Sequence, residues 1–187
     1  VCNLSDGDAR GVYKNLNLDM RQFEQLRMNV HAEDRTFQTE DGDLSIFMRL
    51  GTDYEDNYYE YEIPLTFTKE GVAPNGADPN EDEEYKKLVW PTENEFLFAL
   101  KQLQDLKIER NNKDVSLASI YEIVDPNKPN NKIRIKGNPT LGLVKGVMIG
   151  LKNTNGQGVP QCAEVWVNEL RVSGLNEQGG VAGLARL

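Results

Sequence analysis

The chain is poor in the residues that most often carry chemistry, with a single histidine and two cysteines among 187 residues. Cys2 and Cys162 are far apart, so the Cys-x-x-Cys spacing of a zinc or thioredoxin-type site is absent. We expect two unrelated thiols, and the alternative is a disulfide that joins the first and last parts of the domain. His31 lies in an alternating segment without a neighbouring catalytic partner, so ordinary packing is the simpler interpretation.

Long apolar runs are also missing. No stretch of about 18 apolar residues is present, so we expect no helix that crosses a membrane. The sequence begins at Val1 without the basic and apolar regions of a signal peptide, and it ends at Leu187 within an alternating pattern. We therefore interpret it as a fragment whose localisation signals lie elsewhere.

Positive charge is scarce relative to negative charge. The chain has 30 acidic and 21 basic residues, for a formal net charge of −9. An acidic surface repels phosphate backbones and anionic lipids, so we expect no binding to nucleic acid or to a membrane surface.

No recognisable catalytic motif is present, and we predict that the protein is not an enzyme. Gly150 and Gly156 do not have the spacing of a phosphate-binding loop, and no segment resembles a nucleophile elbow. A carboxylate pair for glycoside hydrolysis stays open, because such pairs need not be close in sequence.

No cofactor is predicted, but calcium is considered. Several acids lie in two loops beside one predicted strand pair, and these are Asp41, Asp43, Asp53, Glu55 and Asp56. Carboxylates are calcium ligands, yet the spacing of an EF-hand is absent, so solvated turn acids are the simpler interpretation.

Alternating apolar and polar residues dominate the sequence and predict strands. The inward rows should contain Leu26, Met28, Val30, Ile46, Met48, Tyr61, Ile63, Ile133, Ile135, Val147, Ile149 and Leu151. About eight strands are expected, so the predicted class is all-β, a jelly-roll-like antiparallel β-sandwich.

One main helix is predicted over residues 93–109, because Thr92 and Glu95 form a capping box before an apolar stripe. The sandwich domain should span residues 1–178, with a flexible loop at 69–84. Residues 179–187 should link it to a following strand.

The segment from Val144 to Val172 predicts a β-hairpin whose second strand has a phase error. Val165 and Val167 share one face by the two-residue period, whereas Leu170 and Val172 fall on the other. A β-bulge at Asn168–Glu169 would bury all four side chains and turn Trp166 to the opposite face. Trp166, Asn168 and Glu169 are therefore the candidate binding residues.

Aromatic residues suggest a second interpretation, a carbohydrate-binding jelly-roll module that could hold a structural calcium ion. The residues that could stack on sugars are Tyr54, Tyr58, Tyr59, Trp90 and Trp166. Aromatic side chains of β-sandwiches more often pack in the core or across strands.

Several segments of the chain are similar to one protein family. They are Tyr13–Leu16 with Leu18–Arg21, Val30–Glu33, Gly42–Leu44, Arg49–Gly51, Asn57–Glu62, Val89–Pro91, Leu106–Lys107, Glu109–Asn111, Lys136–Pro139 and Glu164–Arg171. Together they resemble the SprA/Sov family of Bacteroidetes, giant outer-membrane proteins that form the translocon of the type IX secretion system and serve gliding motility.

The resemblance implies a structural or partner-binding domain that does not itself span the membrane. Its partners would be other parts of the same translocon and its accessory proteins. It would lie in the cell envelope, associated with the outer membrane, on the periplasmic face or at the cell surface. The resemblance implies no catalytic residues.

The loop at residues 69–84 should be dispensable for folding, because it is charged, punctuated by proline and glycine, and poor in large apolar side chains. Replacing it with a short Gly-Ser link should leave the melting temperature within a few degrees. A large drop in a thermal melt would mean that the loop packs on the sandwich.

Overall fold

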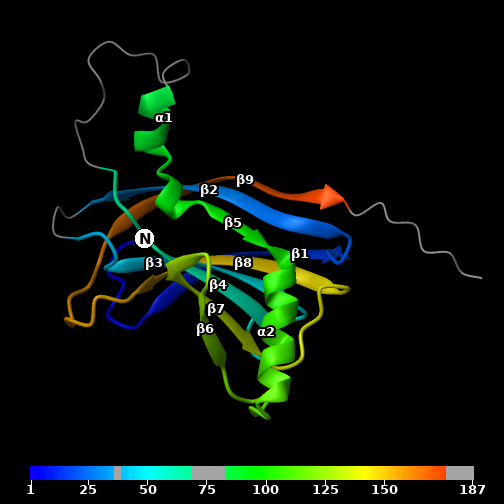
Figure 1. Cartoon of the computed structure of the whole chain (residues 1–187). Coiled ribbons are helices and arrows are strands. Elements are labelled where there is room, and N and C mark those ends of the chain that lie inside the picture. Colours follow the sequence, from blue (N-terminus) through cyan, green and yellow to red (C-terminus); the bar gives the residue numbers. More distant parts are fainter. Residues whose placement is uncertain (36–38, 69–82, 176–187) are drawn as a thin grey trace, which may run out of the picture.

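The computed structural model describes residues 1–35, 39–68 and 83–175. The two sheets lie face to face, and their strands run nearly lengthwise across the molecule (Figure 1). In the described residues the strands are β1 (Ala9–Leu18), β2 (Phe23–Asp34), β3 (Leu44–Gly51), β4 (Tyr58–Pro64), β5 (Phe96–Ala99), β6 (Tyr121–Asp125), β7 (Lys128–Lys136), β8 (Val144–Asn153) and β9 (Ala163–Leu175).

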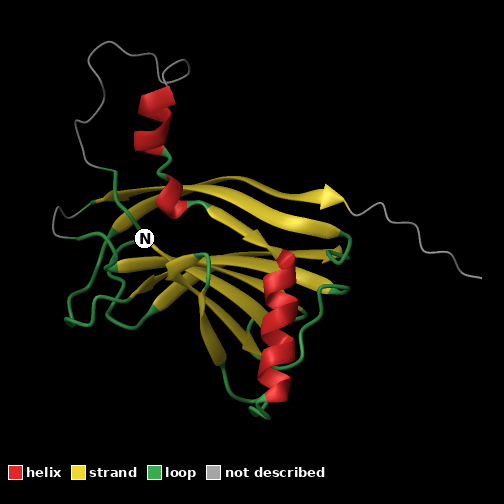
Figure 2. Ribbon diagram, in the orientation of Figure 1, coloured by secondary structure: helices red, strands yellow, loops and turns green. Residues whose placement is uncertain are grey.

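Helical structure is sparse in the described part of the chain (Figure 2). The helices are α1 (Glu83–Val89), a single 3₁₀ turn η1 (Thr92–Asn94), and the main helix α2 (Leu100–Asn112). No helix there has both the length and the apolar composition that a membrane crossing requires.

Every strand pair is antiparallel. The larger sheet has the order β1-β8-β3-β4-β7-β6, and the smaller has the order β5-β2-β9. The predicted class, an all-β antiparallel sandwich with one main helix, is confirmed. The jelly-roll form of its connections stays a prediction, as does the domain boundary at 178. Residues 69–82 and 179–187, which include most of the predicted loop and the predicted linker, lie outside the described residues.

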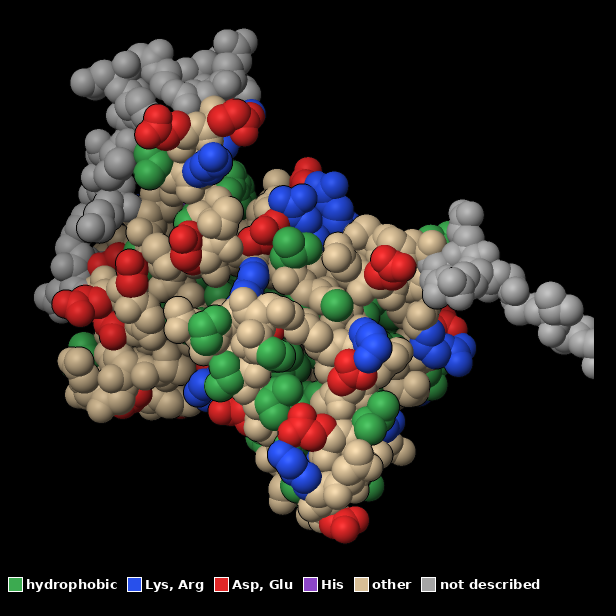
Figure 3. Space-filling model, viewed as in Figure 1, with side chains coloured by type: hydrophobic (Ala, Val, Ile, Leu, Met, Phe, Trp, Pro, Cys, Tyr) green, Lys and Arg blue, Asp and Glu red, His purple; other side chains and the backbone are tan. Residues whose placement is uncertain are grey.

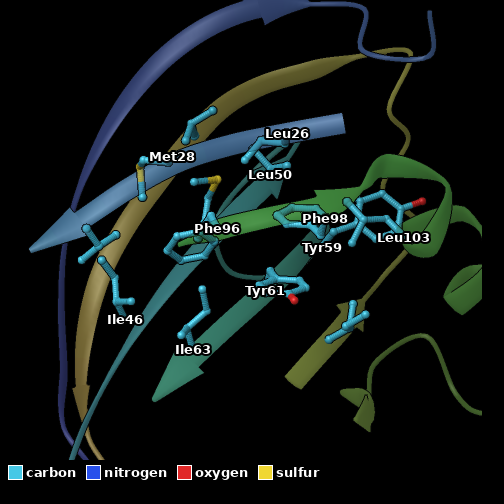
Figure 4. Close-up of a cluster of buried hydrophobic side chains, with 14 of the residues drawn as sticks. Leu26, Met28, Ile46, Leu50, Tyr59, Tyr61, Ile63, Phe96, Phe98 and Leu103 are labelled. Atoms are coloured by element: carbon cyan, nitrogen blue, oxygen red, sulfur yellow. The ribbon is translucent and has the colours of Figure 1, made fainter. Parts of the chain in front are cut away.

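The core fills the space between the sheets, and the two-residue period of the strands supplies it (Figure 4). Tyr61 of β4 stacks on Phe98 of β5, with ring centroids 4.3 Å apart and planes 5° from parallel. Of the predicted inward residues, all are buried except Ile149, which is half-buried against the core. The alternating patterns therefore predicted the core correctly.

The predicted helix over 93–109 is wrong in its first third. Phe96 and Phe98 belong to β5 and pair with Met28 and Leu26, so both rings point into the core. Helix α2 begins only at Leu100. The predicted capping box does not form, because Thr92 accepts the Glu95 N–H through its backbone carbonyl and its side chain caps nothing. Phe96 and Phe98 are two residues apart, a spacing that puts both rings on one face of a strand but not on one face of a helix.

Cys2 and Cys162 form a disulfide, so the prediction of two unrelated thiols is wrong. The first residues of the chain pair with the segment that precedes β9. The Val1 amino group donates to the Ala163 carbonyl at 2.8 Å, and Leu4 and Gln161 form a β-bridge. This pairing brings the two cysteines together across 160 residues of sequence.

A ladder of alternating charges crosses the outer face of the larger sheet. Register places Arg49, Glu60, Arg134 and Glu122 side by side on β3, β4, β7 and β6. Arg49 Nε lies 2.5 Å from Glu60 Oε2, and Arg134 Nη1 lies 2.6 Å from Glu60 Oε1. Arg134 also pairs with Glu62 of β4.

The central charges of the ladder are desolvated although they face away from the core, since Glu60 and Glu62 are each only 4% exposed and Arg134 is buried between them. Burial lowers the pKa of Arg134, but its hydrogen bonds to Glu62 and Glu60 outweigh that effect and raise the pKa above its usual value. Removing one member of the ladder would therefore leave a buried charge without its partner.

Replacing Arg134 with methionine should destabilise the chain by about 3–5 kcal/mol, because two buried carboxylates would lose their shared cation. Lys132→Met is the matched control, since Lys132 lies on the same strand but its side chain is 45% exposed and 3.7 Å from its carboxylate partner. The control should cost about 0–1 kcal/mol. Urea unfolding at neutral pH compares the two, and equal losses would contradict the role given to Arg134.

Candidate functional site

The hairpin predicted over Val144–Val172 is wrong, because β8 belongs to the larger sheet and β9 to the smaller one, and the two strands do not pair. The bulge predicted in its second strand, β9, is present. Asn168 pairs with Asn29 and Arg171 pairs with Arg27, so two residues of β9, Glu169 and Leu170, lie opposite the single residue between the two partners on β2. Glu169 has a φ of 57°, in the left-handed region that a glutamate rarely adopts. The extra residue shifts the side-chain phase of β9 by one position, as the sequence indicated.

The bulge gives Trp166 the orientation that was predicted. Trp166 pairs with His31, whose neighbours Val30 and Ala32 point into the core, so His31 and Trp166 face outward. The Trp166 side chain is 60% exposed. A tryptophan that is this exposed on a sheet face is an unusual feature of a protein surface.

Burial on the inner face of β9 differs from the prediction. Val165 and Val172 pack against the core, but Val167 and Leu170 remain exposed although the bulge turns them inward. They are uncovered because β9 is an edge strand, so the phase argument gave the correct face but not the degree of burial.

Outward-facing side chains of β2 and β9 form one continuous surface, which we call the Trp166 strip. It consists of Arg27, Asn29, His31, Glu33, Glu164, Trp166, Asn168 and Arg171. Acidic and basic side chains are interspersed over the face of the molecule in Figure 3, and the strip shares this mixed character. It is a surface of aromatic, amide and charged groups rather than a patch of one sign.

His31 lies at the centre of an aromatic cluster. Its ring makes edge contacts with both tryptophans, with centroids 5.9 Å from Trp90 and 6.3 Å from Trp166. His31 Nδ1 lies 2.6 Å from the Val89 carbonyl oxygen, and Nε2 lies 3.0 Å from Glu33 Oε1. The buried histidine thus connects the exposed tryptophan to the segment that follows α1.

The end of α1 is held at this cluster by a second contact. Thr68 Oγ1 donates to the Leu88 carbonyl at 3.1 Å and lies 3.2 Å from His31 Nδ1. The helix itself has no buried residues and stands away from both sheets (Figure 1). The C-terminal end of α1 is therefore tied to His31 of the Trp166 strip.

Trp166 is oriented by a hydrogen bond to Glu164, which is itself held by Arg35. Its Nε1 donates to Glu164 Oε1 at 2.7 Å, and Arg35 Nε donates to Glu164 Oε2 at 3.0 Å. These two hydrogen bonds lower the pKa of Glu164, so it is a carboxylate at neutral pH. These contacts hold the ring in one orientation, so the Trp166 side chain would lose less entropy when a partner binds it.

The other candidate residues have different roles. Glu169 forms an ion pair with Arg171 beside the bulge. Arg171 and Arg27 face each other across the strands, and Arg27 is balanced by Glu95, whose Oε1 lies 2.5 Å from its Nε. Glu169 therefore stabilises the bulge and offsets a like-charge contact, whereas Asn168 lies beside Trp166 in the strip.

The acids considered for calcium are not brought together. No group of three or more histidine, cysteine or acidic side chains suited to a metal occurs within the described ranges. Asp41 accepts the Phe67 N–H, Asp43 accepts the Glu40 N–H, and Asp56 pairs with Lys136.

Asp53 accepts hydrogen bonds from residues of its own turn. Partial burial raises its pKa, but hydrogen bonds from the Asn57 side chain and from the backbone N–H groups of residues 55–57 prevail, and the pKa falls to about 2. Each of the four aspartates thus has a donor that explains its position. Calcium binding stays a prediction.

Tyrosines form a smaller site at the other sheet. Tyr13 on the outer face of β1 is 64% exposed and contacts Tyr54, with ring centroids 5.2 Å apart. A pocket of about 470 Å³ adjoins Tyr54 and is lined by Asn15, Leu16, Asn17, Thr52, Leu143, Lys145 and Gly146. Of the other aromatic candidates, Tyr58 and Tyr59 are buried.

Sequence reasoning missed His31 and Tyr13 as members of these sites. His31 could have been found only from the pairing of β2 with β9, which the sequence does not reveal. The whole chain, residues 1–187, matches the model of one protein family, SprA_N, described as a motility related/secretion protein. No curated protein shows a significant match to the chain.

Three truncations separate surface from core. Trp166→Ala should cost about 1 kcal/mol or less, because most of the ring is already in water. Leu170→Ala should also cost little, since the side chain is 44% exposed, whereas Leu26→Ala should cost about 2–5 kcal/mol as a buried control. Urea unfolding measures all three, and a loss at Trp166 as large as that at Leu26 would make it a core residue.

Proposed function

Because the chain belongs to the SprA_N family of motility-related and secretion proteins, we propose that it is a non-enzymatic, extramembrane domain of an outer-membrane protein-secretion translocon. In this role it serves type IX secretion and gliding motility by docking other parts of the translocon or its accessory proteins. The single observation that carries the docking role is the exposed, pre-oriented Trp166 on the outer face of β2 and β9.

The Trp166 strip has the composition of a protein interface. Tryptophan and arginine contribute most to binding at such surfaces, and amides supply adaptable hydrogen bonds around them. His31, Glu33, Glu164 and Arg35 are engaged with one another or with Trp166. Groups arranged in this way hold a ring in place, which supports docking rather than proton transfer.

The disulfide supports a location in the cell envelope. Cys2 and Cys162 are joined, and disulfides persist in the bacterial periplasm and at cell surfaces but are rare in the reducing cytosol. We therefore propose that the domain is associated with the outer membrane, on its periplasmic or its extracellular face.

The proposal is tested by Trp166→Ala in the intact secretion protein. A tryptophan at the centre of an interface contributes about 2 kcal/mol or more to binding, so secretion of a cargo protein into the medium should fall several-fold at an unchanged level of the variant. Val124→Ala, an exposed apolar residue on β6, is the control and should secrete normally. Normal secretion by the Trp166 variant would contradict the docking role.

A carbohydrate-binding module is the second candidate, and the Tyr13–Tyr54 pair favours it. An exposed aromatic face beside a pocket lined by asparagine and threonine is the chemistry that recognises a sugar ring. Oligosaccharide titrations followed by tyrosine and tryptophan fluorescence test it. A saturable change that Tyr13→Ala abolishes would favour this function, and no change at millimolar sugar would remove it.

A further inference from the structure

Edge strand β1 has an inward-facing side chain that no described residue covers. Val12 pairs with Ile149 of β8, which pairs in turn with the buried Met48, so Val12 belongs to the inner face of the larger sheet. Val12 is nevertheless 74% exposed. Ile149 is half-buried for the same reason.

Edge strand β9 has the same feature in the smaller sheet. Val167 pairs with the buried Val30, and the bulge turns Leu170 to the same inner face. Each is 44% exposed. Apolar side chains that face the interior of a sandwich and remain in water mark an interaction site.

The two strands flank one side of the sandwich. Among the described residues, β1 pairs only with β8, and β9 pairs only with β2. Both strands begin close to the Cys2–Cys162 disulfide, and α2 packs at the other side, against β5 and β7. We call this side the open seam and define it by Val12, Lys14, Val167 and Leu170.

The geometry of β9 limits what can bind there. A free strand edge is a template for pairing with another strand. Val1 already pairs with both backbone groups of Ala163, and the bulge interrupts β9 at Glu169, which leaves residues 164–168 as a regular edge. Five residues match the usual length of a β-strand, so a short extended segment fits the available edge.

Charge specifies the side chains of that segment. The inner row of β1 consists of Arg10, Val12 and Lys14, because these residues pair with Leu151, Ile149 and Val147 of the inner face. This row is basic in a chain whose net charge is −9. An acidic and apolar segment complements it, whereas a second copy of this acidic chain is disfavoured by repulsion.

We propose that the open seam binds an extended segment of another protein, which adds as a β-strand along residues 164–168 of β9. The segment directs apolar side chains toward Val12, Val167 and Leu170 and acidic side chains toward Lys14. This surface lies on the inner side of β9 and is separate from the Trp166 strip, so it goes beyond the proposed function.

A fluorescein-labelled nine-residue peptide of alternating glutamate and valine is the probe, and fluorescence anisotropy with the full 187-residue chain is the readout. The peptide should bind, and a peptide with lysine in place of glutamate should bind about tenfold more weakly. Hydrogen exchange should slow in residues 9–18 and 164–168 when the first peptide is bound.

Substitutions test whether the glutamate peptide binds at the open seam. Val167→Lys should weaken the glutamate peptide about tenfold, whereas Val124→Lys, on the edge strand β6, should leave it unchanged. Lys14→Glu should reverse the preference between the two peptides, which a merely unfolded variant would not do.

Four results would overturn the proposal. Three of them are no binding at millimolar peptide, binding that Val167→Lys leaves unchanged, and equal binding of the two peptides by the unmodified chain. Sedimentation that shows a dimer broken by Val167→Lys would also overturn it, because a second copy would then fill the seam. None of these results bears on Trp166, so the docking role of the strip is tested separately.

Discussion

The attachment of the first four residues to the start of β9 determines where both edge strands lie. Leu4 is buried and bridged to Gln161, and Asn153 Nδ2 donates to the Leu4 carbonyl at 2.9 Å. The Cys2–Cys162 disulfide closes this attachment covalently. From this point β1 enters the larger sheet and β9 enters the smaller one. Both the Trp166 strip and the open seam depend on β9, so both depend on this attachment.

The larger sheet illustrates how one strand can be buried on both faces. On β4, Tyr59, Tyr61 and Ile63 enter the core, while Glu60 and Glu62 are buried on the outer face by their pairing with Arg134. Pairing across neighbouring strands gives these buried carboxylates their hydrogen-bond donors. A rigid six-stranded sheet is thereby formed, against which the three-stranded sheet with its exposed tryptophan can pack.

Sequence patterns predicted the features that depend on neighbours along the chain. The two-residue period identified Met28 and Ile133 as core residues, and the phase error in β9 predicted the bulge and the outward Trp166. Features that depend on distant partners were not predictable in this way. The start of α2 depended on the pairing of Phe96 with Met28, and the disulfide depended on the bridge between Leu4 and Gln161.

The candidate site divides along the same line. Its exposed residue, Trp166, was identified from local phase, but its support by His31 and Trp90 requires strand pairing and the position of the segment after α1. Burial of Val167 and Leu170 was predicted wrongly, because burial depends on what lies opposite a strand and not on the face alone. The exposure of these inner residues is the observation from which we propose a binding partner for β9.

Both proposals give β9 the role of a docking strand. Hydrogen exchange of residues 163–175 measures whether a partner covers this strand, once in the isolated chain and once in the native secretion protein in cell envelopes. If β9 docks a partner, its amides exchange more slowly in the envelope. The amides of β6, the edge strand on the far side of the larger sheet, exchange equally in both states. Equal exchange of β9 in the two states would contradict this docking role.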